Sequence, residues 1–200
     1  VLDIPNIKTN KIKNENYKDN HLVLFSIRHN PTLELFEFIS CQEKYPIELL
    51  LNYNYQLRQN IKYNILLGSV VMELKVIKNY SNNTFINIKI IKGLDDNKSG
   101  NNRDENKHKV FTFNPITDQM PIKIGRVNCN INLNNTSVSK LHATINYIDE
   151  TDEFIISDLS STNGTYLLMK KPLDYLCINK DYSFRIFDSK FNIKFVYFDD

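Results

Sequence analysis

The chain has 200 residues, of which 42% are hydrophobic and 12% aromatic, and its formal net charge is +2. This composition is that of a globular protein with enough chain to bury a core, and it excludes a fully disordered polymer. The near-neutral balance gives no electrostatic case for nucleic-acid binding. No apolar run is long enough to span a bilayer, so neither nucleic acid nor membrane is expected as a partner.

The cysteines and histidines show no metal-ligand pattern. The three cysteines, Cys41, Cys129 and Cys177, form no C-x-x-C pair and are odd in number, so we expect free thiols in a reducing compartment. The four histidines lie far apart in the sequence. There is also no phosphate-binding P-loop and no dinucleotide fingerprint. Neither a metal nor a cofactor is therefore expected.

The first 80 residues divide into two parts. Residues 1–20 are polar and rich in Lys and Asn, without an apolar period. Over 21–80, short apolar runs rich in β-branched and aromatic residues are separated by Asn, Pro and Gly-Ser breaks, which predicts strands. A helix over 33–44 is the alternative at one place, but the close spacing of turn signals favours strands. The polar stretch at 78–83 is the predicted domain boundary.

A second unit is predicted over residues 84–200. Strand-like runs follow one another here at short spacing without intervening helices, a pattern typical of an all-β sandwich of antiparallel strands. The segment at about 94–108 mixes Gly, Asn, Asp and Lys without an apolar period. It is predicted to be a mobile loop.

The two units can be laid over one another as a weak internal repeat. The run YNILLGSVVMELKVI (63–77) lies on YSFRIFDSKFNIKFV (182–196), with Tyr63 on Tyr182. Two interpretations stay open, because alternating strands match one another easily by chance. Residues 21–77 are either β-sheet of another kind or a degenerate, N-terminally truncated copy of the second unit.

Three short signals, each set between apolar runs, lie in order within the second unit. They are Gly125-Arg126, Ser139-x-x-His142 and Thr162-Asn163-Gly164-Thr165. Thirteen positions lead from the Arg to the Ser, and twenty-one from the His to the Asn. In this order and spacing the signals resemble the forkhead-associated (FHA) family of phosphothreonine-reading domains. The resemblance implies an FHA-like β-sandwich, a threonine-phosphorylated protein as partner and an intracellular location, nuclear or cytoplasmic.

A phosphothreonine carries about −1.5 to −2 charges at neutral pH and several acceptor oxygens. Arg126 suits the cation role, because its planar fork donates bidentately and keeps its proton; taken alone, it would be a surface Arg in an ion pair. By the resemblance, Ser139 donates its hydroxyl to the phosphate and Lys140 adds a backbone N–H or its ammonium. Asn163 is expected to bond the peptide backbone, and Thr162 to reach the phosphate or the peptide.

Four further residues are expected to shape the loops without touching the ligand. Gly125 precedes the Arg, and His142 is architectural by the resemblance. Asp158 is expected to steady the loop before the Asn-Gly turn, where Gly164 tolerates positive φ. The resemblance also implies that selectivity around the phosphothreonine depends on Ser137 and on the loop at 170–174. That loop departs from the family pattern, since it is more apolar and carries two lysines.

Two further observations bear on function. Ser139, His142 and Asp158 invite comparison with a nucleophilic triad, but no G-x-S-x-G elbow or glycine-rich oxyanion loop accompanies them. Catalysis by these residues is therefore rejected. Asn134, Asn135 and Asn163 lie in N-x-S/T triplets in or beside the expected loops, where a glycan would block binding, so the protein is not expected in the secretory pathway.

Two non-catalytic functions remain. One is a phospho-dependent reader that recruits a threonine-phosphorylated partner. The other is a structural interaction module that docks through its sheet face or its N-terminal half without phosphate. Arg126 discriminates between them, because only the reader depends on its charge. The presence of Arg126, Ser139 and Asn163 together favours the reader.

Overall fold

The computed structural model describes residues 25–30, 35–40, 47–51, 54–93, 109–169, 173–176 and 181–194. Every regular element in these ranges is a β-strand, which confirms the all-β prediction. The predicted polar segment 1–20 and the predicted loop at about 94–108 lie outside the described residues. No helix long and apolar enough to cross a membrane occurs within the described ranges. The strands are β1 (Phe25–Asn30), β2 (Leu35–Ser40), β3 (Ile47–Leu50), β4 (Tyr55–Leu57), β5 (Lys62–Leu67), β6 (Val70–Lys78), β7 (Thr84–Lys92), β8 (Val110–Phe113), β9 (Ile122–Gly125), β10 (Ile131–Asn132), β11 (Ala143–Ile148), β12 (Glu153–Asp158), β13 (Thr165–Met169), β14 (Leu173–Leu176), β15 (Asp181–Ile186) and β16 (Ser189–Lys194).

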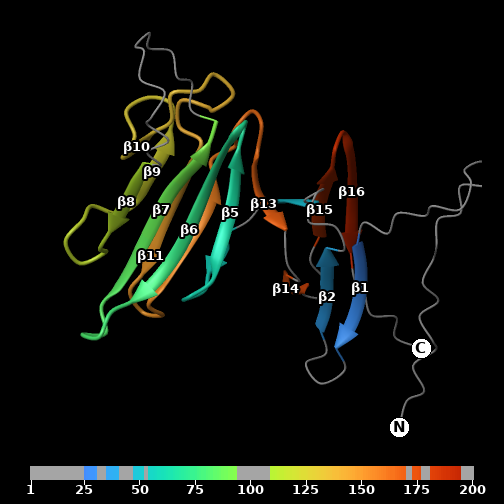
Figure 1. Cartoon of the computed structure of the whole chain (residues 1–200), viewed down its shortest axis with the longest axis horizontal. Coiled ribbons are helices and arrows are strands. Elements are labelled where there is room, and N and C mark those ends of the chain that lie inside the picture. The colour runs from blue at the N-terminus through green and yellow to red at the C-terminus, as the bar shows by residue number, and fades with distance from the viewer. Residues whose placement is uncertain are drawn as a thin grey trace, which may run out of the picture.

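Two sheets form the sandwich, and a third, smaller sheet accompanies them (Figure 1). The large sheet has eight strands in the order β16-β15-β3-β13-β5-β6-β7-β8, and its partner has five in the order β10-β9-β11-β12-β4. The small sheet has the order β1-β2-β14. The described pairings between these strands are antiparallel except for β9 with β10.

The core lies between the large sheet and its five-stranded partner. Along β7, buried and half-buried residues alternate from Thr84 to Ile90, because successive side chains of a strand point to opposite faces. The inward positions of both sheets carry Ile, Leu, Val and Phe, and they form one cluster of buried residues. Each such side chain contributes about 1.5–3 kcal/mol when it is fully buried.

The predicted boundary at 78–83 is a hairpin turn. β6 and β7 pair antiparallel on either side of it, and the Asn83 N–H donates to the Asn79 side chain at 2.9 Å. A polar, Asn-rich stretch closes a tight turn as readily as it makes a linker, which is why the sequence pattern was misleading. β3, β5 and β6 lie in the same sheet as β13 and β7. The strands over 47–78 are therefore part of the sandwich and do not form a separate sheet of their own.

The internal repeat has a structural counterpart in two hairpins, β5–β6 and β15–β16. Their registers correspond: Tyr63 faces Leu74 in the first hairpin, and Tyr182 faces Ile193 in the second. Both turns contain two residues, and the first of each has positive φ. β5 pairs with β13, and β15 pairs with β3. The two hairpins thus flank the central β3–β13 pair on opposite sides.

Candidate functional site

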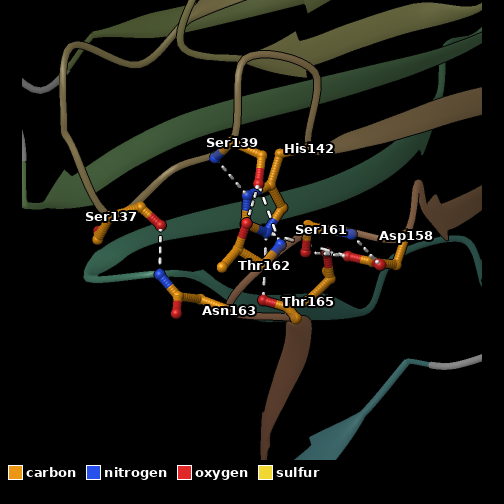
Figure 2. Close-up of polar contacts among 9 residues, drawn as sticks. Ser137, Ser139, His142, Asp158, Ser161, Thr162, Asn163 and Thr165 are labelled. Atoms are coloured by element: carbon orange, nitrogen blue, oxygen red, sulfur yellow. Dashed lines mark hydrogen bonds and ion pairs between the residues drawn. The ribbon is translucent and has the colours of Figure 1, made fainter.

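Three loops meet at one end of the sandwich. They follow β9, lead from β10 to β11, and lead from β12 to β13. The Arg126 N–H donates to the Ser139 carbonyl at 3.0 Å, and the Val127 N–H donates to the Lys140 carbonyl at 3.2 Å. The Thr162 N–H donates to the Ser139 hydroxyl at 3.1 Å (Figure 2). Ser139 is thus the point at which all three loops are joined.

Four of the five residues expected to touch ligand are exposed, whereas none of the four expected to shape the loops is. Arg126, Lys140, Thr162 and Asn163 are exposed, and Ser139 is half-buried. A charged or amide side chain at the rim can meet a ligand without first leaving a buried partner. The structure therefore places the five expected contact residues at one accessible end of the sandwich.

Gly125 permits the close approach of the first two loops. The residue is buried, and a Cβ at this position would lie 2.3 Å from the Lys140 carbonyl oxygen. A larger residue would push the loop at 137–141 outwards. Gly125 therefore acts on the site through backbone packing.

His142 links the second loop to the third. Its ring is fully buried; Nδ1 accepts the Ser139 N–H at 3.1 Å, and Nε2 lies 3.2 Å from the Gly164 carbonyl. This arrangement requires the neutral tautomer with its proton on Nε2. Burial is the main cause that lowers the pKa of His142, and a lowered pKa keeps the ring neutral. His142 is thus a strut between the loops.

The same contacts bear on the triad comparison. The imidazole Nδ1 of His142 is taken by the backbone N–H of Ser139, while the Ser139 hydroxyl accepts from Thr162. Nε2 lies 4.0 Å from the Asp158 carboxylate, which is beyond hydrogen-bond distance. A nucleophile–base couple is not formed among these described residues.

Asp158 holds the third loop closed from its base. Its carboxylate accepts the Ser161 N–H at 2.9 Å, the Ser161 hydroxyl at 2.7 Å and the Thr165 hydroxyl at 2.6 Å (Figure 2). Two loop residues, Ser160 and Gly164, have positive φ, at 55° and 75°. The bonds to Asp158 stabilise this tight path.

Asn163 connects the third loop to the second from the rim. Its Nδ2 donates to the Ser137 carbonyl at 2.7 Å (Figure 2). The amide retains its Oδ1 acceptor and a second N–H. In this arrangement Asn163 has the spare groups needed to bond a peptide backbone.

Several supporting residues were not foreseen from the sequence. Asn135 is buried, and its Nδ2 donates to the Gly93 carbonyl at 2.7 Å and to the Ser69 hydroxyl at 2.9 Å. The Asn135 Oδ1 accepts the Ser137 N–H at 2.8 Å, and the Ser69 N–H donates to the Ser137 hydroxyl at 2.8 Å. The Gly68-Ser69 pair signalled a turn, but nothing in the sequence indicated that this turn supports a loop 68 residues further on.

Within the described ranges, no group of three or more His, Cys, Asp or Glu residues is arranged to hold a metal ion. Cys129 is a free thiol that donates to the Val127 and Lys140 carbonyls, and burial raises its pKa. Cys41 and Cys177 lie outside the described residues. Cys129 thus serves the packing of the first loop.

Comparison with known proteins gives a family for this part of the chain. Residues 122–179 match the family model of the FHA domain, a segment that contains all three motifs. No solved structure matches the chain. FHA is a protein-interaction family without a catalytic role. The chain therefore carries an FHA domain, a module for phospho-dependent protein interaction.

Proposed function

We propose that this protein recognises phosphothreonine on a partner protein. Arg126 supplies the fixed cation, and Ser139 and Lys140 supply donors to the phosphate oxygens. Thr162 reaches the phosphate or the adjacent peptide, and Asn163 bonds the peptide backbone. Gly125, His142, Asp158 and Gly164 hold these groups in place.

The observation that carries the proposal is the joining of three loops at Ser139. Two backbone N–H groups, from Arg126 and Thr162, bond to this one residue. Recognition of a doubly charged group needs donors that converge before the ligand arrives, because ordering them on binding costs affinity. A rigid sandwich with functional loops at one end meets this requirement.

The charge of the rim supports the same proposal. Arg126 and Lys140 are exposed, and among the described side chains no ion pair involves either of them. A dianionic phosphate would therefore not have to displace an internal carboxylate. Exposed charges are screened by salt, so binding should weaken as ionic strength rises.

The same site supports a location inside the cell, in the nucleus or cytoplasm. Asn135 lies in an N-x-S/T triplet, but its side chain is buried and donates to Gly93 and Ser69. A glycan at Asn135 would break this support, and one at Asn163 would cover the binding loop. Because glycosylation at these positions is incompatible with the binding site, we infer that the protein does not pass through the secretory pathway.

The alternative remains a phosphate-independent structural module that docks through its sheet face. It predicts that Arg126 can be replaced without loss of binding. The reader predicts the opposite, because removing the guanidinium leaves the phosphate without its bidentate partner.

The test is binding of fluorescent phosphothreonine peptides to the whole chain, measured by anisotropy. We expect micromolar binding to the best peptides and at least about a tenfold loss for Arg126→Ala, since charge-assisted bonds contribute about 1.5–3 kcal/mol. Lys123→Ala is the matched control, because Lys123 is an exposed cation within β9, three residues before Arg126.

Three results decide the question. Unphosphorylated peptides should not bind, and Arg126→Lys should recover only part of the affinity, because an ammonium cannot donate bidentately. If phosphorylation makes no difference to a well-folded sample, the reader is wrong and the structural module replaces it.

A further inference from the structure

A cavity of about 360 Å³ lies beside the third loop, on the side of the β15–β16 hairpin. Its lining includes Thr162, Asn163 and Gly164 from the loop and Arg185 and Lys190 from the hairpin. Leu50 from the end of β3 contributes to the lining. The cavity thus shares lining residues with the loop proposed to hold the phosphopeptide.

Arg185 is held in a fixed orientation. It pairs with Glu48 across β15 and β3, and its Nε donates to the Glu48 carboxylate. Its guanidinium carbon lies 4.1 Å from the centroid of the Tyr166 ring, within the range of a cation–π contact. The Nε–Glu48 bond leaves the four N–H groups of the two Nη atoms to serve another acceptor.

Lys190 adds a second positive charge on the neighbouring strand. It faces Arg185 in the antiparallel register of β15 and β16, where directly opposite residues are about 5 Å apart at Cβ. Lys190 is exposed, and among the described carboxylates none lies within ion-pair distance of it. Like charges placed directly opposite one another repel, and the described ion pair of Glu48 is with Arg185 and not with Lys190.

The acidic side chains nearby are already occupied. Glu48 is engaged by Arg185. Asp158, which also lines the cavity, accepts three bonds from Ser161 and Thr165 at the base of the loop. Lys190 therefore stands without a neutralising partner. An anionic ligand group would complete the site.

The related hairpin shows that these charges are not needed to build the fold. The positions equivalent to Arg185 and Lys190 are Leu66 and Val71, which face one another in β5–β6. The same backbone thus forms with an apolar pair. Of the two hairpins, it is β15–β16, the one that lines the cavity, that carries a basic pair at these positions.

We propose that Arg185 and Lys190 form an accessory subsite for an anionic side chain of the bound peptide, either a carboxylate or a second phosphorylated residue. This proposal rests on phosphothreonine recognition by the adjacent loops. It deepens that function by naming the sequence preference: a phosphothreonine with an acidic or phosphorylated neighbour. The neighbour lies within a few residues of the phosphothreonine, since an extended chain spans about 3.3–3.6 Å per residue.

The experiment uses the whole chain and a set of phosphothreonine peptides that share one core sequence. In the parent peptide, the flanks are alanine. In two further series, one glutamate or one phosphoserine is moved through about four positions on either side, within the reach set by the extended chain. The glutamate and phosphoserine series separate the two sources of negative charge.

We expect one register in which the anion improves the affinity by about three- to tenfold, the range typical of a charge-assisted contact at a partly exposed site. Lys190→Gln should reduce this preference to less than about twofold while leaving the parent peptide's affinity unchanged. Arg185→Gln should do the same, with its fold checked by circular dichroism because Arg185 also packs on Tyr166. Lys194→Gln is the control, since Lys194 is an exposed cation on the same strand that faces Asp181 away from the cavity lining.

Two results overturn the proposal while leaving the proposed function intact. One is that no register of acid or phosphoserine improves binding over the parent peptide. The other is that the preference survives in both Lys190→Gln and Arg185→Gln. If the parent peptide itself fails to bind, phosphothreonine recognition is wrong and the accessory subsite falls with it.

Discussion

The hairpins β5–β6 and β15–β16 share a register but differ in their surroundings. The first strand of each has the same alternation of buried and half-buried positions after one exposed residue. The second strands differ: β6 is buried along most of its length between β5 and β7, whereas β16 lies at the edge of the sheet and is mostly exposed. Alternation therefore decides which face of a strand points inward, and the neighbouring strands decide how deeply it is buried.

Their turns differ in the same way. Gly68 has a φ of +58°, and a Cβ there would lie 2.4 Å from the Ser137 carbonyl oxygen. Phe187, its counterpart, has a φ of +53° and is 64% exposed. The first turn is thus packed against a binding loop, while the second turn carries a bulky residue in a conformation that favours glycine. One hairpin supports the site, and the other lines a cavity next to it.

The largest effect is expected for Gly68→Ala. The added Cβ would meet the Ser137 backbone, and alanine at positive φ costs about 1–3 kcal/mol by itself. A shift of Ser137 would also break about one hydrogen bond. We therefore expect the free energy of unfolding to fall by about 2–4 kcal/mol. Urea denaturation followed by circular dichroism measures this change.

The control for that prediction is Phe187→Ala at the equivalent turn. Alanine is smaller than phenylalanine and the position is exposed, so the change in the free energy of unfolding should be below about 1 kcal/mol. Equal losses from the two substitutions would show that the turns are equivalent and that packing on Ser137 is unimportant.

A smaller loss is expected for Asn135→Ala, which removes the bridge between the first hairpin's turn and the binding loop. The Ser137 N–H and the Gly93 carbonyl would lose their partner, and an unsatisfied buried group costs about 1–3 kcal/mol. Phosphopeptide affinity should fall as well, because Asn163 bonds the Ser137 carbonyl. Anisotropy and urea denaturation measure the two effects.

Asn192→Ala provides the matched variant in the second hairpin. Asn192 accepts a bond from Ser183 at an exposed position of β15–β16, so its loss should cost less than about 0.5 kcal/mol. Phosphopeptide affinity should remain that of the unmodified chain. A loss of affinity from Asn192→Ala would mean that both hairpins support the loops.

His142, which links the second and third loops, makes the stability of the chain depend on pH. Burial lowers the pKa of His142 from its ordinary 6.5, so the unfolded chain takes up a proton at a higher pH than the folded chain does. Stability should therefore fall as the pH drops below about 6.5, and the loops should open before the second hairpin. Hydrogen exchange of the 137–142 and 159–164 amides against those of β15–β16 measures this difference. In His142→Gln, this component of the pH dependence should disappear; an unchanged slope would assign it to other groups.

The sequence indicated which residues of the candidate site lie close together more fully than it indicated the assembly of the fold. Arg126, Ser139 and Asn163 are predicted together because their three short motifs, in this order and spacing, resemble the FHA family. The sequence does not place the β5–β6 hairpin in the sandwich, because β5 pairs with β13 about 100 residues further on, and pairing between distant strands leaves no mark in a local pattern. The Asn-rich stretch at 78–83 has another explanation: its composition suits a linker and a tight turn equally, and here it closes the β6–β7 hairpin. The support that Ser69 gives to Ser137 could be found only from the structure.

The smallest effect is expected for Phe187→Gly, and its sign should be opposite to that of Gly68→Ala. Glycine relieves a bulky residue of positive φ, which should stabilise the chain by about 0.5–1 kcal/mol. The loss of the contacts made by the Phe187 ring opposes this gain, but a residue that is 64% exposed has little buried surface to lose. A higher urea midpoint, with an unchanged dependence of the free energy of unfolding on urea concentration, would show that the second turn also favours glycine at this position. A lower midpoint would show that the contacts of the Phe187 ring stabilise the chain by more than its positive φ destabilises it. The second turn would then be stabilised by a side chain, and the first by the packing of its backbone on Ser137.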